Sequence, residues 1–302
     1  MVVGADTTAP VPGPEGNTAI VCDSTTYLPR ELVEANGIRE VSLYVTLEGR
    51  QQAELEIPDY TEFYDRLRAS EEGATTSQPS VGDFLAAYEP PLADGGEIVS
   101  IHLSAGISGT CEAATQARQR LINDGAGGER IHVYDSSSAC AGFGLVALAA
   151  ANAAREGADA AGVLERARSA RHSLQLWFAV DTLEYLKRGG RIGAAQALLG
   201  STLRIKPILT IGEEIAPVER VRTRKRAHER LVEFARTLHE KGDDGWAVQH
   251  IQDLDSAERM AERCRPIFGC DPQFISEIGP VIGAHTGPGL VGVGSVSRDM
   301  LG

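Results

Sequence analysis

Short runs of β-branched and aliphatic residues alternate with helix-length segments between Asn17 and about Ala170. This alternation is typical of a parallel sheet covered by helices on both faces, as in Rossmann-like folds. The sequence therefore predicts an α/β first domain over residues 18–171. Its predicted strands are Thr18–Cys22, Ile38–Leu47, Glu97–Leu103 and Arg130–Tyr134. Its predicted helices are Pro29–Asn36, Tyr60–Ser70, one that begins at Val81, Thr110–Asp124, Ala139–Glu156 and Gly157–Arg171, with a polar linker at Thr75–Ser80.

Beyond this region the extended segments follow one another more closely, and fewer helices separate them. This pattern predicts a smaller α+β second domain over residues 172–302, with a boundary near Ser169–Ser173. We leave open that the C-terminal strand returns to the first domain. We expect residues 1–17, which are rich in Gly, Pro and Thr, to form a disordered tail. The predicted strands are Leu174–Val180, Lys206–Ile211, Ile215–Val221, Trp246–Ile251 and Gln273–Ile278, and the predicted helices are Thr182–Lys187, Lys225–Lys241 and Ser256–Phe268.

Composition and charge exclude several classes of protein. The 302 residues carry 42 acidic and 29 basic side chains, and the resulting net charge of -13 disfavours binding to nucleic acid. The longest apolar segment, Ala139–Ala154, is shorter than the ~20 residues that cross a bilayer, so it predicts a buried helix and no membrane span. The five cysteines are odd in number and form no C-x-x-C pair, which indicates reduced thiols in a cytoplasmic protein.

Three predicted strands of the first domain end in hydroxyl-rich turns: Asp23–Thr26, Ser104–Thr110 and Asp135–Ser138. The carboxyl ends of parallel strands share one edge of a sheet, where helix N-termini also offer free N–H groups to an anion. The turns could together bind a small anion, and neutral donors of this kind suit a carboxylate. The alternative is that these Ser, Thr and Asp residues only cap helices, as they commonly do.

Two glycine-rich segments of the second domain resemble site loops. Residues 186–193 (LKRGGRIG) gather three cations around a flexible turn in an otherwise acidic chain, and residues 283–289 (GAHTGPG) hold His285 in a tight loop. The alternatives are a solvated helix C-terminus for the first segment and a turn histidine bonded to the backbone for the second.

Familiar catalytic and cofactor motifs are missing from the sequence. It has no G-x-x-x-x-G-K-[ST] loop, no G-x-G-x-x-G fingerprint in these turns, and no G-x-S-x-G nucleophile elbow. The seven histidines and five cysteines show no metal-ligand spacing. We therefore expect no metal site and no nucleotide cofactor.

Taken together, the motifs resemble the DegV family of bacterial fatty-acid-binding proteins. They follow one another in family order across nearly the whole chain from about Thr18. The matching segments are Val21–Thr25 (VCDST), Thr76–Ser80 (TSQPS), Ser100–Thr110 (SIHLSAGISGT), His132–Ser138 (HVYDSSS), Thr182–Gly193 (TLEYLKRGGRIG), Leu203–Leu209 (LRIKPIL) and Gly279–Gly289 (GPVIGAHTGPG).

The resemblance implies a carrier and not an enzyme. Such a protein would bind a long-chain fatty acid in a buried tunnel between its two domains, with no other cofactor. It would present the carboxylate to a separate ATP-dependent fatty-acid kinase, which would form the acyl phosphate. The implied carboxylate-binding residues are Thr76, Ser104 and His285, with Ala105 where the family commonly has a second serine. Arg191, and with less support Arg222, would serve the encounter with the kinase or the transferred phosphate.

Two other functions compete with the carrier. One is a phosphotransferase or hydrolase that uses Ser104 as nucleophile, His285 as base and Arg191 as anion clamp. The other is a regulatory binding module in which the lipid is structural. The missing phosphate loop and metal cluster favour the carrier over a phosphotransferase.

Overall fold

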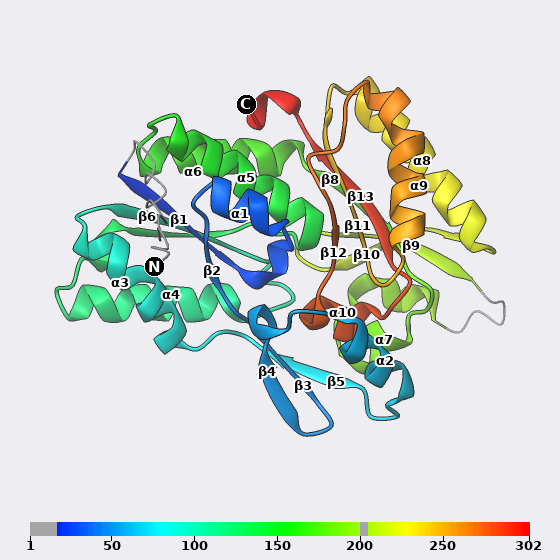
Figure 1. The fold of residues 1–302 in the computed structure, drawn as a ribbon, viewed down its shortest axis with the longest axis horizontal. Helices are drawn as coiled ribbons and strands as arrows, with labels where there is room; N and C mark the ends of the chain where they lie inside the picture. Colours follow the sequence, from blue (N-terminus) through cyan, green and yellow to red (C-terminus); the bar gives the residue numbers. More distant parts are fainter. Residues whose placement is uncertain (1–16, 200–204) are drawn as a thin grey trace, which may run out of the picture.

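The computed structural model describes residues 17–199 and 205–302, and these form an α/β protein built on three sheets (Figure 1). The predicted fold class, a parallel-sheet domain followed by an α+β domain, is confirmed. Of the predicted N-terminal tail, residues 1–16 lie outside the described residues. Asn17 is part of the fold, because its side chain donates to the Gly95 carbonyl and its own carbonyl accepts from the Glu97 N–H.

The first sheet has four parallel strands in the order β2-β1-β6-β7. Helices α3 and α4 cover one face, while α5 and α6 cover the other (Figure 1). The strands are β1 (Thr18–Asp23), β2 (Arg39–Val41), β6 (Glu97–His102) and β7 (Ile131–Asp135). The helices of this part are α1 (Arg30–Ala35), α3 (Val81–Ala93), α4 (Thr110–Asn123), α5 (Cys140–Arg155) and α6 (Ala160–Ser173).

The second sheet has six strands in the order β10-β9-β8-β13-β11-β12, and all neighbours are antiparallel except β11 and β12. The last strand, β13, lies between β8 and β11, so it does not return to the sheet of the first domain. Helices α8 (Arg224–Glu240) and α9 (Leu254–Phe268) cover the outer face of the sheet (Figure 1). The strands are β8 (Gln175–Ala179), β9 (Lys206–Ile211), β10 (Ile215–Val221), β11 (Gly245–His250), β12 (Ile275–Glu277) and β13 (Val291–Val296).

A third, three-stranded antiparallel sheet was not expected, and it corrects two predictions. The predicted strand Ile38–Leu47 is broken into β2 and β3, which belong to different sheets, and the predicted linker Thr75–Ser80 begins with strand β5. The new sheet packs against α10, which also contacts α2 and α7 near the bottom of Figure 1. These elements are β3 (Tyr44–Leu47), β4 (Arg50–Ala53), β5 (Ala74–Ser77), α2 (Thr61–Ala69), α7 (Glu184–Arg188) and α10 (Pro280–Thr286).

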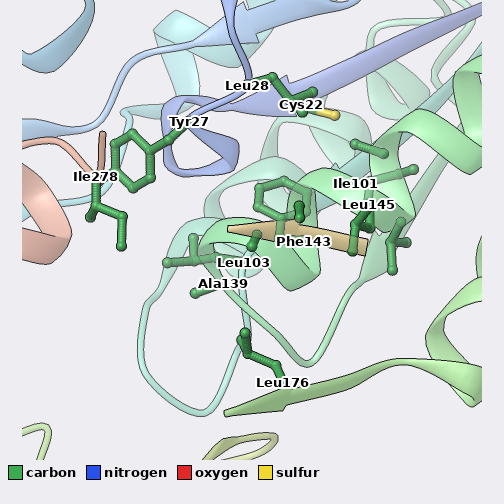
Figure 2. Close-up of a cluster of buried hydrophobic side chains, with 14 of the residues drawn as sticks. Cys22, Tyr27, Leu28, Ile101, Leu103, Ala139, Phe143, Leu145, Leu176 and Ile278 are labelled. Carbon is green, nitrogen blue, oxygen red and sulfur yellow. The ribbon is translucent and has the colours of Figure 1, made fainter. Parts of the chain in front are cut away.

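Helix α5 lies between the two large sheets, because it contacts β1 on one side and β11 and β13 on the other. Of its 16 residues 13 are buried, which explains why its sequence is apolar on every face. Figure 2 shows Phe143 of this helix among side chains from both halves of the chain, including Ile101 of β6 and Leu176 of β8. The predicted boundary near Ser169–Ser173 coincides with the end of α6 and stays a prediction.

Candidate functional site

A cavity with an empty volume of about 900 Å³, counted with its open mouth, lies between the start of α5, the inner face of the second sheet, α10 and β5. Most of the lining is apolar and comes from both halves of the chain. The apolar lining residues are Leu43, Leu103, Ile107, Ala139, Ala141, Leu176, Phe178, Leu186, Ile211, Ile215, Ile278, Val281, Ile282 and Leu290.

Thr76 and His285, both predicted as site residues, meet in the wall of this cavity. The Thr76 hydroxyl lies 2.8 Å from Nε2 of His285, so strand β5 and helix α10 are joined by a hydrogen bond. Gly189 packs directly on the imidazole, since a Cβ atom there would lie 2.1 Å from Nδ1. The structure therefore brings two residues that are 209 positions apart into one polar site.

The imidazole of His285 is neutral near pH 7, because burial and then the nearby Arg191 cation lower its pKa to about 4. Its Nδ1 atom is buried and has no hydrogen-bond partner. A buried N–H without an acceptor is rarer in proteins than an unfilled acceptor, which favours the proton on Nε2. In that tautomer Nε2 donates to the Thr76 oxygen, and the Thr76 hydroxyl hydrogen is free for an anion in the cavity.

Arg191 lies at the mouth of the cavity, where it is exposed to solvent. Its Nε donates to the Ile107 carbonyl at 3.4 Å and its guanidinium donates to the Gly189 carbonyl at 2.8 Å. The segment of residues 186–193 is thus hydrogen-bonded to the Ser104–Thr110 turn, which follows β6. Two of its three glycines, Gly190 and Gly193, have positive φ angles, which explains why glycine occupies these positions.

Ser104 and Ala105 are placed differently from the prediction, and neither is among the residues that line the cavity. The Ser104 hydroxyl is fully buried and donates to the Gly212 carbonyl at 2.8 Å. Ala105 is exposed, and its N–H donates to the Asp135 carboxylate at 3.2 Å. Gly106 contacts the same hairpin as Ser104, because a Cβ there would lie 1.6 Å from the Glu213 carbonyl oxygen. The first part of this turn therefore holds the β9–β10 hairpin.

The later part of the same turn does reach the cavity. Ile107, Ser108 and Gly109 line it, and Gly109 packs against the Gln78 side chain. The Ser108 hydroxyl is 2.8 Å from that of Thr110, at the start of α4. The predicted anion-binding turn thus contributes to the site through its second half.

The turn at Asp23 supports the fold and does not line the cavity. Its fully buried carboxylate accepts from the Thr25 N–H and hydroxyl, from the Leu103 N–H, and contacts Nδ1 of His102 at 3.2 Å. Nε2 of His102 is 2.7 Å from the Ser100 hydroxyl, which in turn is 2.7 Å from the Tyr88 hydroxyl. We call this set (Tyr88, Ser100, His102 and Asp23) the buried relay. Here the alternative interpretation, local capping and support, describes the structure.

Arg222 is exposed and directly follows β10, away from the residues that line the cavity. The other end of this strand, at Ile215, lines the cavity and packs on Gly193 of the Arg191 loop. With 7 residues at about 3.3 Å each, β10 separates the two ends by roughly 20 Å. Arg191 and Arg222 therefore do not form one cationic site.

Three further candidate residues, at or beside the cavity, were not identified from the sequence. Gln78 and Gln249 line the cavity, and Glu54 is a buried carboxylate beside it that accepts from Ser24, Tyr27 and the Val281 N–H. Burial raises the pKa of Glu54 to about 7. A signal existed for Gln249, because this glutamine and the following His250 interrupt the apolar residues of the segment WAVQHI. Glu54 gave no signal, since it lies in the mixed segment QQAELE and no periodic pattern places it inside.

Two further observations bear on the class of site. Within residues 17–199 and 205–302, no group of three or more His, Cys, Asp or Glu side chains could hold a metal ion. In the same residues, no helix combines the length and apolar character required to cross a bilayer.

The comparison with known proteins agrees with the resemblance found in the motifs. A family model described as the DegV family of uncharacterised proteins matches residues 17–298. A DegV domain-containing protein of Streptomyces coelicolor is 39% identical over 289 residues, which cover 93% of this chain and 99% of the relative. Protein DegV of Bacillus subtilis is 34% identical over 284 residues, with 92% and 98% covered.

Solved structures share the fold as well. A DegV family protein of Thermus thermophilus, described as binding fatty acid, superposes with a TM-score of 0.82 at 34% identity, covering 93% of this chain and 99% of the other. DegV of Bacillus subtilis, described as a fatty acid binding protein, gives a TM-score of 0.81 at 34% identity, covering 94% and 100%. With a family match over almost its whole length and such relatives, this chain belongs to the DegV family.

Proposed function

We propose that this protein binds one long-chain fatty acid in the cavity and presents its carboxylate to a separate ATP-dependent fatty-acid kinase, which forms the acyl phosphate. The observation that carries the proposal is the Thr76–His285 pair in the wall of an otherwise mainly apolar cavity. An amphipathic ligand with one small polar head group matches this distribution. The solved DegV relatives described as fatty-acid-binding proteins support the same ligand class.

The head-group end suits a carboxylate because it offers hydrogen-bond donors without a buried cation. Thr76 would donate directly, and the neutral His285 behind it would orient the hydroxyl. Charge-assisted bonds of this kind are the stronger ones among hydrogen bonds. Arg191, exposed at the mouth, adds a favourable field without being fully desolvated. Ser104 could join the carboxylate only by giving up its bond to Gly212.

The acyl chain would occupy the apolar remainder of the cavity. Removing apolar surface from water stabilises a complex by about 25 cal/mol per Å² of buried area. Side chains from α5, β8 and α10 would enclose the chain, so affinity depends on the correct packing of both halves of the protein.

The kinase would meet the protein at the loop around Arg191. Lys187, Arg188 and Arg191 form a local positive cluster on a chain of net charge -13, which favours an acidic partner or a transferred phosphate. Arg222, beyond the far end of β10, is less suited to this role.

The competing hydrolase or phosphotransferase is less well supported. Its nucleophile and base would have to meet, yet the Ser104 hydroxyl is bonded to Gly212 and the His285 ring to Thr76. The low pKa of His285, about 4, also makes it a weak general base at neutral pH. A carrier needs neither a contact between Ser104 and His285 nor a basic imidazole.

The ligand can be tested by native mass spectrometry of the folded protein and by analysis of the extracted lipid. We expect about one fatty acid per chain, because an empty apolar cavity loses dispersion contacts along its lining. Added fatty acid should also raise the melting temperature by mass action. Protein that carries no lipid and shows no thermal shift with any long-chain acid would contradict the proposal.

The role of Arg191 is tested by Arg191→Ala, with Arg222→Ala as the matched control. We expect Arg191→Ala to leave fatty-acid affinity nearly unchanged and to slow phosphorylation of the bound lipid sharply in a coupled ATP-consumption assay. Arg191→Lys should restore the rate only in part, because lysine lacks the planar guanidinium fork. Equal slowing by Arg222→Ala would show that the kinase contacts a wider surface. Loss of lipid affinity in Arg191→Ala would place this residue in the carboxylate site instead.

A further inference from the structure

A second polar position lies inside the cavity, at Gln249 on β11. This residue lines the cavity and only 1% of its surface is exposed. It stands opposite Ser276 on β12 and Gly292 on β13, and Gly292 stands opposite Phe178 on β8. Directly opposed residues share a face of a sheet, so Gln249, Gly292 and Phe178 form one row across the cavity floor. Gly292 adds no side chain to that row, and a Cβ atom there would lie only 3.0 Å from Cβ of Phe178.

The orientation of the Gln249 amide is fixed by its surroundings. Its Nε2 lies 3.2 Å from the carbonyl oxygens of both Thr26 and Tyr27, and 2.9 Å from the Ser276 hydroxyl. A flipped amide would place its oxygen against two carbonyl oxygens, which can only accept. The nitrogen therefore faces these three groups, none of which belongs to the cavity lining.

The amide oxygen is left without a partner. Oε1 of Gln249 is buried and accepts no hydrogen bond in the structure. A buried acceptor without a donor costs free energy, and an apolar acyl chain packed against it supplies none. Gln249 is thus a polar group held in a fixed orientation on the floor of a cavity that otherwise suits hydrocarbon.

Gln249 is not part of the Thr76–His285 pair. Its amide bonds to the Thr26 and Tyr27 carbonyls and to Ser276, whereas the Thr76 hydroxyl bonds to His285. A ligand whose carboxylate is at Thr76 and His285 would therefore reach Gln249 with its hydrocarbon part.

We propose that Gln249 is a specificity-determining residue that accepts a hydrogen bond from a hydroxyl on the acyl chain, so that the cavity favours a monohydroxylated long-chain fatty acid. A hydroxyl is the donor that fits, because it is neutral and can be carried on the hydrocarbon part of the ligand. A cationic donor would face the full cost of desolvation. The inference rests on the proposed function, since it requires a fatty acid in this cavity.

The test measures the affinity of delipidated protein for octadecanoic acid and for a series of its monohydroxylated isomers, with the hydroxyl moved stepwise along the chain. We expect one isomer, or two neighbouring ones, to bind at least as tightly as octadecanoic acid. The others should bind roughly tenfold more weakly, because their hydroxyl is buried without a partner.

Two variants assign the preference to Gln249. Gln249→Met keeps a long side chain and removes the acceptor, so the favoured isomer should fall to the affinity of the others while octadecanoic acid binds as well as before or better. Ser276→Ala removes a partner of the amide nitrogen but not the free oxygen, so the preference should persist. Circular dichroism and thermal unfolding check that each variant folds.

The outcomes separate the inference from the proposed function. If octadecanoic acid binds but every hydroxylated isomer binds more weakly than it, the inference is wrong and the carrier function stands, whether or not Gln249→Met folds. If the preference survives Gln249→Met, another residue causes it and the assignment is wrong. If none of these acids binds, the proposed function fails, and the inference fails with it.

Discussion

Two histidines in this molecule, His102 fully buried and His285 half-buried, illustrate the difference between a supporting residue and a candidate ligand-binding residue. His102, in the buried relay, has partners on both ring nitrogens, Asp23 on one side and Ser100 on the other. His285 has one partner, Thr76, and its second nitrogen is buried without any. A polar group whose bonding capacity is used within the protein stabilises the fold and offers little to a ligand. A polar residue that lines a cavity and has an atom without a hydrogen-bond partner, as His285 does, is a candidate for binding a ligand.

The largest expected effect comes from breaking the supporting histidine's network. Asp23→Ala leaves His102, Thr25 and the Leu103 N–H without their buried acceptor and should lower the free energy of unfolding by about 3–5 kcal/mol. Tyr88→Phe, at the far end of the relay, removes a single bond and should cost only about 1 kcal/mol. Urea unfolding measures both. Equal losses in the two variants would show that the relay is not organised around Asp23.

A smaller effect, on affinity and not on stability, is expected at the cavity. Thr76→Val removes the proposed carboxylate donor and should weaken fatty-acid binding by roughly 1–3 kcal/mol, while the unfolding free energy changes little. Ser104→Ala is the matched control, since its hydroxyl is bonded to Gly212. It should cost about 1 kcal/mol of stability and leave affinity unchanged. Fluorescence titration and urea unfolding give the two readouts, and a large loss of affinity in Ser104→Ala would return that hydroxyl to the carboxylate site.

A third expected effect, confined to acidic pH, is a pH dependence that belongs to His285. Its pKa is about 4 in the folded protein against 6.5 for the free side chain, so the unfolded chain binds more protons between these values. The stability contributed by neutral His285 is therefore present above about pH 6.5 and decreases as the pH falls toward 4. His285→Gln should lessen this acid-side loss. A His285 NMR titration midpoint near 6.5 would contradict the expectation.

Much of the architecture could be predicted because it depends on local periodicity. Strands β1 and β6 of the first sheet and the apolar helix α5 follow directly from runs of apolar residues that are long enough to identify, whereas β2 (REV) was predicted only as part of a longer strand. The third sheet could not be predicted in this way. Strand β5 has the sequence ATTS and none of its residues is fully buried, so it carries no alternation of apolar and polar positions.

Thr76 and His285 could be proposed from sequence because both lie in distinctive motifs, and the structure places them together in the cavity wall. Their role in binding a ligand stays a prediction. Ser104 lies in an equally distinctive motif, but its partner is a carbonyl 108 positions away, which no local pattern reveals. Gln249 could not be singled out from sequence for a related reason. Its proposed role depends on its amide oxygen having no partner, and only the folded structure shows that the amide nitrogen takes all the available contacts.

The central position of β13 has a consequence for protein synthesis. Strands β8, β9 and β10 can pair as soon as they leave the ribosome, yet β11 and β12 join them only through β13, which is the last strand to be made. Until then the edge of β8 is open to other chains, a situation that favours aggregation. The cavity wall at Leu290 and Gly292 is also missing from such a nascent chain. The protein therefore completes the cavity only after the whole second sheet has been translated. A ribosome paused before β13 would expose an aggregation-prone intermediate with an incomplete cavity.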